Sequence, residues 1–146
     1  MWNMMNEDSN FPESPMECED QSEAFQRVGP GTADAPYDFF AIDYWPCKYT
    51  EGADPVALRD AQAKFAMEHY GHGAEGGFRF IYPTSGGPRG DGPDFWISAA
   101  APGVAARGSN IDIFRSKSYG SEAEQERWNH MTCDNSSTWV GWRLHN

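Results

Sequence analysis

A dense run of aromatic and β-branched residues covers residues 37–49. Such a run is typical of a β-strand. Shorter apolar runs at 78–82, 94–101 and 138–144 predict three further strands, and the glycine-rich residues between the first two of these indicate a hairpin. Pro46 lies inside the first run, so we expect it to end that strand, to form a bulge or to lie where no amide hydrogen is needed.

Helical periodicity is clearest at residues 56–70, which include many good helix formers. Asp54 supplies an N-cap acceptor and Pro55 fits the first helical position, so the helix is expected to begin there. Gly71 and Gly73 are typical of its end. The face predicted to be buried consists of Leu58, Ala61, Phe65 and His69.

Two shorter helices are expected at residues 109–117 and 121–131, the second because its first residues form a capping-box pattern. The order strand, helix, strand, strand, helix, strand predicts an α+β fold with helices on one face of an antiparallel sheet. This βαββαβ order is that of ferredoxin-like units. The first and last strands are neighbours in that topology, so Cys47 and Cys133 could approach each other near the sheet edge. Whether they bond depends on the distance between their Cα atoms.

Residues 1–36 differ in composition from residues 37–146. The first segment is acidic and rich in proline, a mixture that buries little apolar surface, so much of residues 6–36 is expected to be loop. Its sequence Trp2–Met5 is echoed by Trp128–Met131, and each copy is followed by a cysteine and a short strand-like segment. The N-terminal segment is therefore a candidate remnant of a preceding repeat, and residues 37–146 form the predicted α+β domain.

The chain is acidic, with 22 Asp and Glu against 11 Lys and Arg and a formal net charge of −11. Its field repels phosphate backbones and anionic membrane surfaces, which argues against nucleic acid and membranes as partners. No run approaches the ~20 apolar residues of a membrane span, and residues 1–10 lack the features of a secretory signal, so a cytoplasmic location is expected. The cysteines have no metal-site spacing, and reduced thiols are expected.

The segments Tyr44–Gly52 and Cys133–Ser137 resemble a group of uncharacterised bacterial proteins built from ferredoxin-like units. Those units look like members of the dimeric α+β barrel class, and the resemblance covers residues 37–146. It implies a sheet that pairs with a second copy or a second repeat to enclose a cavity. The class includes cofactor-independent monooxygenases, haem-degrading enzymes and polyketide cyclases, so the resemblance implies an architecture rather than a reaction. No catalytic motif of any branch matches here, and no residue role is transferred.

Asp43 is a carboxylate within the first predicted strand, flanked by Ile42 and Tyr44. Strand alternation places it on the face opposite both neighbours. If that face lines a cavity, burial would suit the carboxylate for proton transfer, whereas on a solvent face Asp43 would only solubilise the sheet. The candidate residues for acid/base catalysis without a cofactor are Asp43, His69 and His130.

His69 and His72 lie at the end of the predicted helix, where their imidazoles could approach one metal ion with His130 as a third ligand. The alternative is that His69 is a core or capping histidine. No acidic ligand accompanies these histidines at a recognisable spacing, so no metal or cofactor is expected.

Aromatic rings could line a cavity for a flat apolar ligand, or could simply form the core of a small sheet protein. The residues concerned are Tyr44, Trp45, Phe95, Trp96, Trp128, Trp139 and Trp142. Arg79 and Arg115 could clamp an anion or could pair with surface carboxylates.

The sequence therefore favours a ferredoxin-like unit that self-associates through its sheet and encloses an aromatic-lined pocket for a small organic ligand. The ligand-binding residues expected are Tyr44, Trp45, Trp96, Arg115 and Trp128. A non-catalytic assembly or protein-binding module and a haem- or metal-binding protein are the alternatives.

Overall fold

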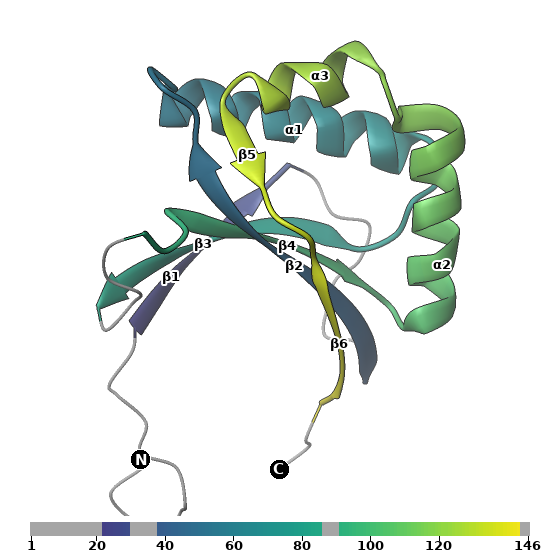
Figure 1. Cartoon of the computed structure of the whole chain (residues 1–146). Coiled ribbons are helices and arrows are strands. Elements are labelled where there is room, and N and C mark those ends of the chain that lie inside the picture. The colour runs from purple at the N-terminus through teal and green to yellow at the C-terminus, as the bar shows by residue number, and fades with distance from the viewer. Residues whose placement is uncertain (1–21, 30–37, 86–90, 144–146) are drawn as a thin grey trace, which may run out of the picture.

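The computed structural model describes residues 22–29, 38–85 and 91–143. These residues form one antiparallel sheet with helices on one of its faces (Figure 1). The strands are β1 (Ser22–Val28), β2 (Phe39–Tyr49), β3 (Gly77–Ser85), β4 (Phe95–Ala101), β5 (Met131–Cys133) and β6 (Ser137–Trp142). The helices are α1 (Pro55–Gly71), α2 (Val104–Ile113), a π-helical turn η2 (Phe114–Ser118) and α3 (Glu122–Trp128).

The strand order is β1-β3-β4-β2-β5, and β6 also pairs with β2. Both β5 and β6 therefore lie along the same side of β2, one after the other. This α+β arrangement is compatible with a ferredoxin-like fold, and the predicted strands and first helix are confirmed. No helix among the described residues is long and apolar enough to cross a membrane.

Pro46 lies within β2 without ending it. The residues of β2 before it, Phe39–Tyr44, pair with β6, and those after it, Cys47–Tyr49, pair with β5. The Pro46 carbonyl accepts a hydrogen bond of 2.9 Å from the Asp134 amide, so the proline nitrogen also faces the short linker between β5 and β6. Pro46 thus occupies a gap in the hydrogen-bond ladder between β2 and the strands β5 and β6, where no amide hydrogen is needed. This agrees with the last of the three alternatives that the sequence leaves open for Pro46.

Helix α1 begins and ends where the sequence predicts. The Asp54 side chain accepts a hydrogen bond of 2.9 Å from the Val56 amide, and Pro55 takes the first helical position. Beyond the helix end, Gly73 adopts a φ of 96°, which other residues rarely adopt. All four residues of the predicted face, Leu58, Ala61, Phe65 and His69, are buried.

The strand-like segment expected after Cys18 in the sequence, residues 24–28, lies in β1, which pairs with β3 along its length within a stretch otherwise expected to be mostly loop. Two local predictions are corrected. The helix expected at residues 109–117 begins earlier, at Val104, directly after Gly103 with its φ of 100°. The helix expected to reach Met131 ends at Trp128, because Met131 is buried in the core as the first residue of β5.

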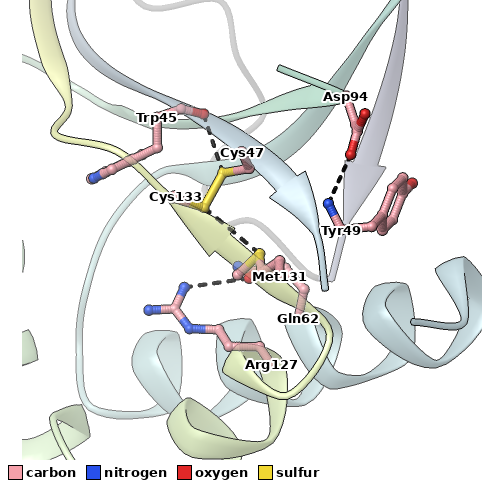
Figure 2. The surroundings of a disulfide bond; sticks show 8 residues. All are labelled: Trp45, Cys47, Tyr49, Gln62, Asp94, Arg127, Met131 and Cys133. Carbon is pink, nitrogen blue, oxygen red and sulfur yellow. Dashed lines mark hydrogen bonds between the residues drawn. A yellow bond between two sulfur atoms is a disulfide. The ribbon is translucent and has the colours of Figure 1, made fainter. Parts of the chain in front are cut away.

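Cys47 and Cys133 form a disulfide, which corrects the expectation of reduced thiols (Figure 2). The two residues are direct partners across the antiparallel pair of β2 and β5, and their Cα atoms are 4.1 Å apart. Directly opposed residues of neighbouring strands are close enough for their sulfur atoms to bond. The remaining cysteine, Cys18, lies outside the described residues.

Fully buried side chains fill the space between α1 and the sheet. They include Leu58, Phe65, Phe80, Phe95 and Met131. The rings of Phe80 and Phe95 meet edge to face with centroids 5.4 Å apart, an arrangement that aromatic pairs favour. Burial of these side chains supplies the main apolar stabilisation of the domain.

Candidate functional site

A cavity of about 390 Å³ lies between the helix-covered face of the sheet and the segment from α2 to α3. The sheet contributes Asp43 and Trp45 from β2 together with Phe78, Ile97, Ala99, Ala100 and Ala101. The helical layer contributes Phe65, His69, Tyr70, Arg107, Asn110, Ile111, Phe114, Arg115, Arg127 and Trp128. Cys133 and Ser136 complete the lining. The wall is mostly apolar and aromatic, with a few polar groups, which is the usual composition of small-molecule sites.

Asp43 points into this cavity because alternate residues of β2 face the helices, and Ala41, Asp43 and Cys47 are all buried on that face. Nε of Arg107 donates to both carboxylate oxygens of Asp43, at 3.0 and 2.8 Å. The hydroxyl of Thr138 on β6 also donates to the carboxylate and accepts a 2.9 Å hydrogen bond from Nη2 of Arg107. A buried charge is tolerated when it is paired and hydrogen-bonded in this way. Asp43 therefore fixes Arg107 in the cavity wall.

His69 is buried in the opposite wall, with its Nδ1 3.2 Å from the hydroxyl oxygen of Ser118. Its ring stacks on Phe65, with an interplanar angle of 10° and centroids 5.6 Å apart. Burial, and to a smaller extent the positive charge of Arg127, lower the pKa of His69 to about 4. The imidazole is therefore neutral at pH 7.

Arg127 extends from the short helix α3 and is 8% exposed. Its guanidinium carbon lies 3.9 Å from the ring centroid of Phe65 and 4.5 Å from that of Trp128, so the cation is in contact with two aromatic faces. Nη1 donates to the side-chain oxygen of Gln62 at 3.3 Å (Figure 2). Burial lowers the pKa of Arg127 to about 10, and the carboxylate of Glu124 acts in the opposite sense. The guanidinium remains charged at neutral pH.

The π-helical turn η2 brings two polar side chains to this region. The Tyr119 amide donates to the Phe114 carbonyl at 2.7 Å, which is the wide hydrogen bond of a π turn. Within this turn Arg115 lines the cavity while Ser118 is buried against His69. Arg115 is exposed and forms no ion pair with any described residue.

Five of the residues predicted for catalysis or ligand binding line this one cavity: Asp43, Trp45, His69, Arg115 and Trp128. Tyr44 and Trp96 lie instead on the helix-free face of the sheet, because they alternate with Asp43 and with Phe95 along their strands. His130 is half-buried and is not part of the cavity wall.

The other candidate residues are dispersed. Phe95 belongs to the core, whereas Trp139, Trp142 and Arg79 are exposed on their strands. His72 is exposed beyond the end of α1. In the part of the chain that the structure describes, no group of three or more histidine, cysteine or carboxylate side chains could hold a metal ion.

Arg107 and Arg127 are lining residues that sequence reasoning missed. Arg127 lies three residues after Glu124 on a helix that Ser121 caps. This spacing is typical of an ion pair within one helix, so it could have identified Arg127 as the partner of Glu124. Arg107 has no comparable local signal, because its partner Asp43 lies 64 residues earlier in the chain. Comparisons with protein-family models, with curated proteins and with solved structures found no match for this chain. The cavity geometry is therefore the basis for assigning a function.

Proposed function

We propose that this chain binds a small, largely apolar organic molecule in the cavity between its sheet and its helices. The supporting observation is an unfilled space of about 390 Å³ lined by Trp45, Phe114 and Trp128. Small-molecule sites typically have volumes of roughly 300–1,000 Å³ and similar aromatic walls. The space adjoins a hydrophobic core that includes Leu58, Phe80 and Phe95, none of which lines it, so it is a local feature at one side of the core.

Acid/base catalysis without a cofactor, by Asp43 together with His69, is the enzymatic form of this proposal. The two side chains line the same cavity. The carboxylate of Asp43, however, accepts hydrogen bonds from Arg107 and Thr138, and the low pKa of His69, about 4, makes its imidazole a weak base. These two facts favour binding over proton transfer.

A pair of matched substitutions tests the binding function. Phenylalanine at Ala99, on the cavity wall, would occupy the space, whereas phenylalanine at Ala105, exposed on α2, would not. Binding of the neutral fluorescent probe N-phenyl-1-naphthylamine, or of its anionic sulfonate analogue, is measured by titration. We expect both the wild type and Ala105→Phe to bind, and Ala99→Phe to bind at least about tenfold more weakly, because overpacking the site costs more than 1 kcal/mol. Equal binding by all three proteins, or none by the wild type, would contradict the proposal.

The second candidate function is self-assembly, as a ferredoxin-like unit of the dimeric α+β barrel class that pairs with a second copy through its sheet. The strand order β3-β4-β2-β5 supports the ferredoxin-like assignment. The helix-free face of the sheet bears half-buried Ile42, Tyr44 and Trp96, and on β6 Trp139 is 64% exposed. Exposed apolar clusters of this kind are typical of interaction sites.

Sedimentation equilibrium tests this assembly. We expect the wild type to form a dimer that Trp139→Asp disrupts, because a carboxylate would be desolvated in the interface. Tyr119 is 72% exposed on the helical side, so Tyr119→Asp is the control and should remain dimeric. A monomeric wild type at all concentrations would rule out self-assembly and would leave the binding proposal intact.

A further inference from the structure

We infer that the ligand of this cavity is an organic anion, with an aromatic or apolar body and one carboxylate, sulfonate or phosphate group that Arg127 and Arg115 bind. This inference rests on the proposed binding function and specifies the chemistry of the ligand.

The distribution of charge around the cavity is opposite to that of the whole chain. The chain carries a net charge of −11, yet Arg107, Arg115 and Arg127 all line the cavity. Asp43 is the only carboxylate among the described lining residues, and Arg107 neutralises it. Glu124 lies outside the lining and offsets part of the charge of Arg127 at 3.7 Å, whereas Arg115 has no such partner among the described residues. The arginines therefore give the cavity a positive potential that is strongest near Arg115, which favours an anion.

The hydrogen bonds of Arg127 leave one nitrogen of its guanidinium for a ligand. Nη1 is bonded to Gln62, while Nε is enclosed by protein atoms, which puts it out of reach of a molecule in the cavity. Nη2 forms only a long ion pair of 3.7 Å with Glu124, whose carboxylate accepts a hydrogen bond from the indole N–H of Trp128. Nη2 can therefore donate to an oxygen of an oxyanion, and such a charge-assisted hydrogen bond is stronger than one to a neutral group.

The same guanidinium is held firmly in place. Phe65 contacts its face at 3.9 Å and Trp128 at 4.5 Å, so the cation is oriented before any ligand arrives. Preorganisation of this kind reduces the entropic cost of binding. The aromatic walls then accommodate the apolar body of the ligand next to its charged group.

Arg115 is suited to a complementary contact at the cavity edge. It is exposed, lines the cavity and has no ion-pair partner among the described residues, so its charge is available to a second ligand oxygen. A cationic ligand would be repelled by both arginines.

Two probes with the same aromatic body test this inference. 8-Anilinonaphthalene-1-sulfonate carries one sulfonate, and N-phenyl-1-naphthylamine lacks it. We expect the wild type to bind the sulfonate at least about tenfold more tightly at low salt, and Arg115→Gln to reduce that preference by about tenfold, because a hydrogen bond to a charged group has this magnitude. Binding of the neutral probe to that variant measures any effect of the substitution on the cavity itself, so the readout is the ratio of the two affinities.

Two further variants complete the experiment. Arg59 is exposed, pairs with neighbouring Asp60 and is not part of the cavity wall, so Arg59→Gln is the control and should keep the full preference. Arg127→Lys keeps the charge but removes Nη2 and the planar group that contacts Phe65 and Trp128, and it should also lose preference for the sulfonate. Because Arg127 is buried, this variant needs a circular dichroism check of its fold, whereas exposed Arg115 gives a result independent of folding.

The outcomes distinguish the inference from the proposed function. If the neutral probe binds as tightly as the sulfonate, or if Arg115→Gln and Arg127→Lys both keep the preference, the anion inference is overturned and the binding function stands. If neither probe binds the wild type, both are overturned. If both arginine variants lose the preference for the sulfonate and Arg59→Gln retains it, the result supports the anion inference and the binding function.

Discussion

Helices α1 and α2 cover the same face of the sheet in different ways (Figure 1). Six residues of α1 are buried, among them Leu58 in the hydrophobic core and Phe65 and His69, which also line the cavity. No residue of α2 is fully buried, although Arg107, Asn110 and Ile111 line the cavity. Helix α1 thus contributes to both the core and the cavity wall, whereas α2 adds no residue to the buried core. A substitution on the cavity side of α2 is therefore expected to cost the core little.

The largest expected effect concerns the disulfide, which ties β5 to β2 beside the cavity. Removing it in Cys47→Ala/Cys133→Ala should lower the free energy of unfolding by about 4 kcal/mol, because a long loop in the unfolded chain is then no longer closed. Urea unfolding measures this change, and the wild type in reductant should match the variant. A loss below about 1 kcal/mol would show that noncovalent packing alone holds β5 in place beside the cavity.

A smaller effect is expected from truncating one aliphatic side chain in each helix. Leu58 on α1 is 1% exposed, whereas Ile111 on α2 is half-buried beside the cavity. Leu58→Ala should cost about 3 kcal/mol, and Ile111→Ala about 1 kcal/mol, because its surroundings already include empty space. Chemical unfolding of both variants measures the difference. Equal losses would contradict the contrast between the two helices.

An effect comparable to these truncations is the pH dependence from His69, where α1 meets the cavity. Its pKa is about 4 in the folded chain, below the ordinary value of 6.5, so the folded state binds fewer protons between these values. The free energy of unfolding should therefore be highest above pH 6.5 and fall as the pH is lowered towards 4, by roughly 1 kcal/mol per pH unit at most. His69→Gln should flatten this fall, and His72→Gln, at an exposed position, should not. Identical profiles for the wild type and His69→Gln would show that protonation of His69 does not limit stability.

Local patterns were sufficient for much of the fold. The cap at Asp54, the proline at the helix start and the apolar face of α1 act within a few residues, and β2, β3, β4 and β6 follow from aromatic and β-branched runs. Strand β1 was predicted only as a short strand-like segment in a proline-rich, acidic stretch, and its position at the sheet edge depends on pairing with β3, which the sequence does not give. The short β5 was missed because three residues carry too little periodicity.

The site was predictable only in part. The alternation of side chains along β2 predicts that Asp43 lies on the face opposite Ile42 and Tyr44. Whether that face lines a cavity or meets solvent depends on the position of α2, which the sequence does not give. The roles of Arg107 and Arg127 depend on partners that are distant in sequence, Asp43 and Gln62. The disulfide likewise depends on the register of β2 and β5, which no local pattern fixes.

The gap in the ladder at Pro46 divides one edge of the sheet into two units of different local stability. β5 is fixed to β2 by the disulfide and by the buried Met131. β6 is held by backbone pairing and by Thr138, while most of its side chains are exposed. Segments with few buried contacts open at a lower free energy than the rest of a domain. Opening of β6 would remove the Thr138 hydroxyl from Asp43 and give water access to the Asp43–Arg107 ion pair, while the core between α1 and the sheet stays folded.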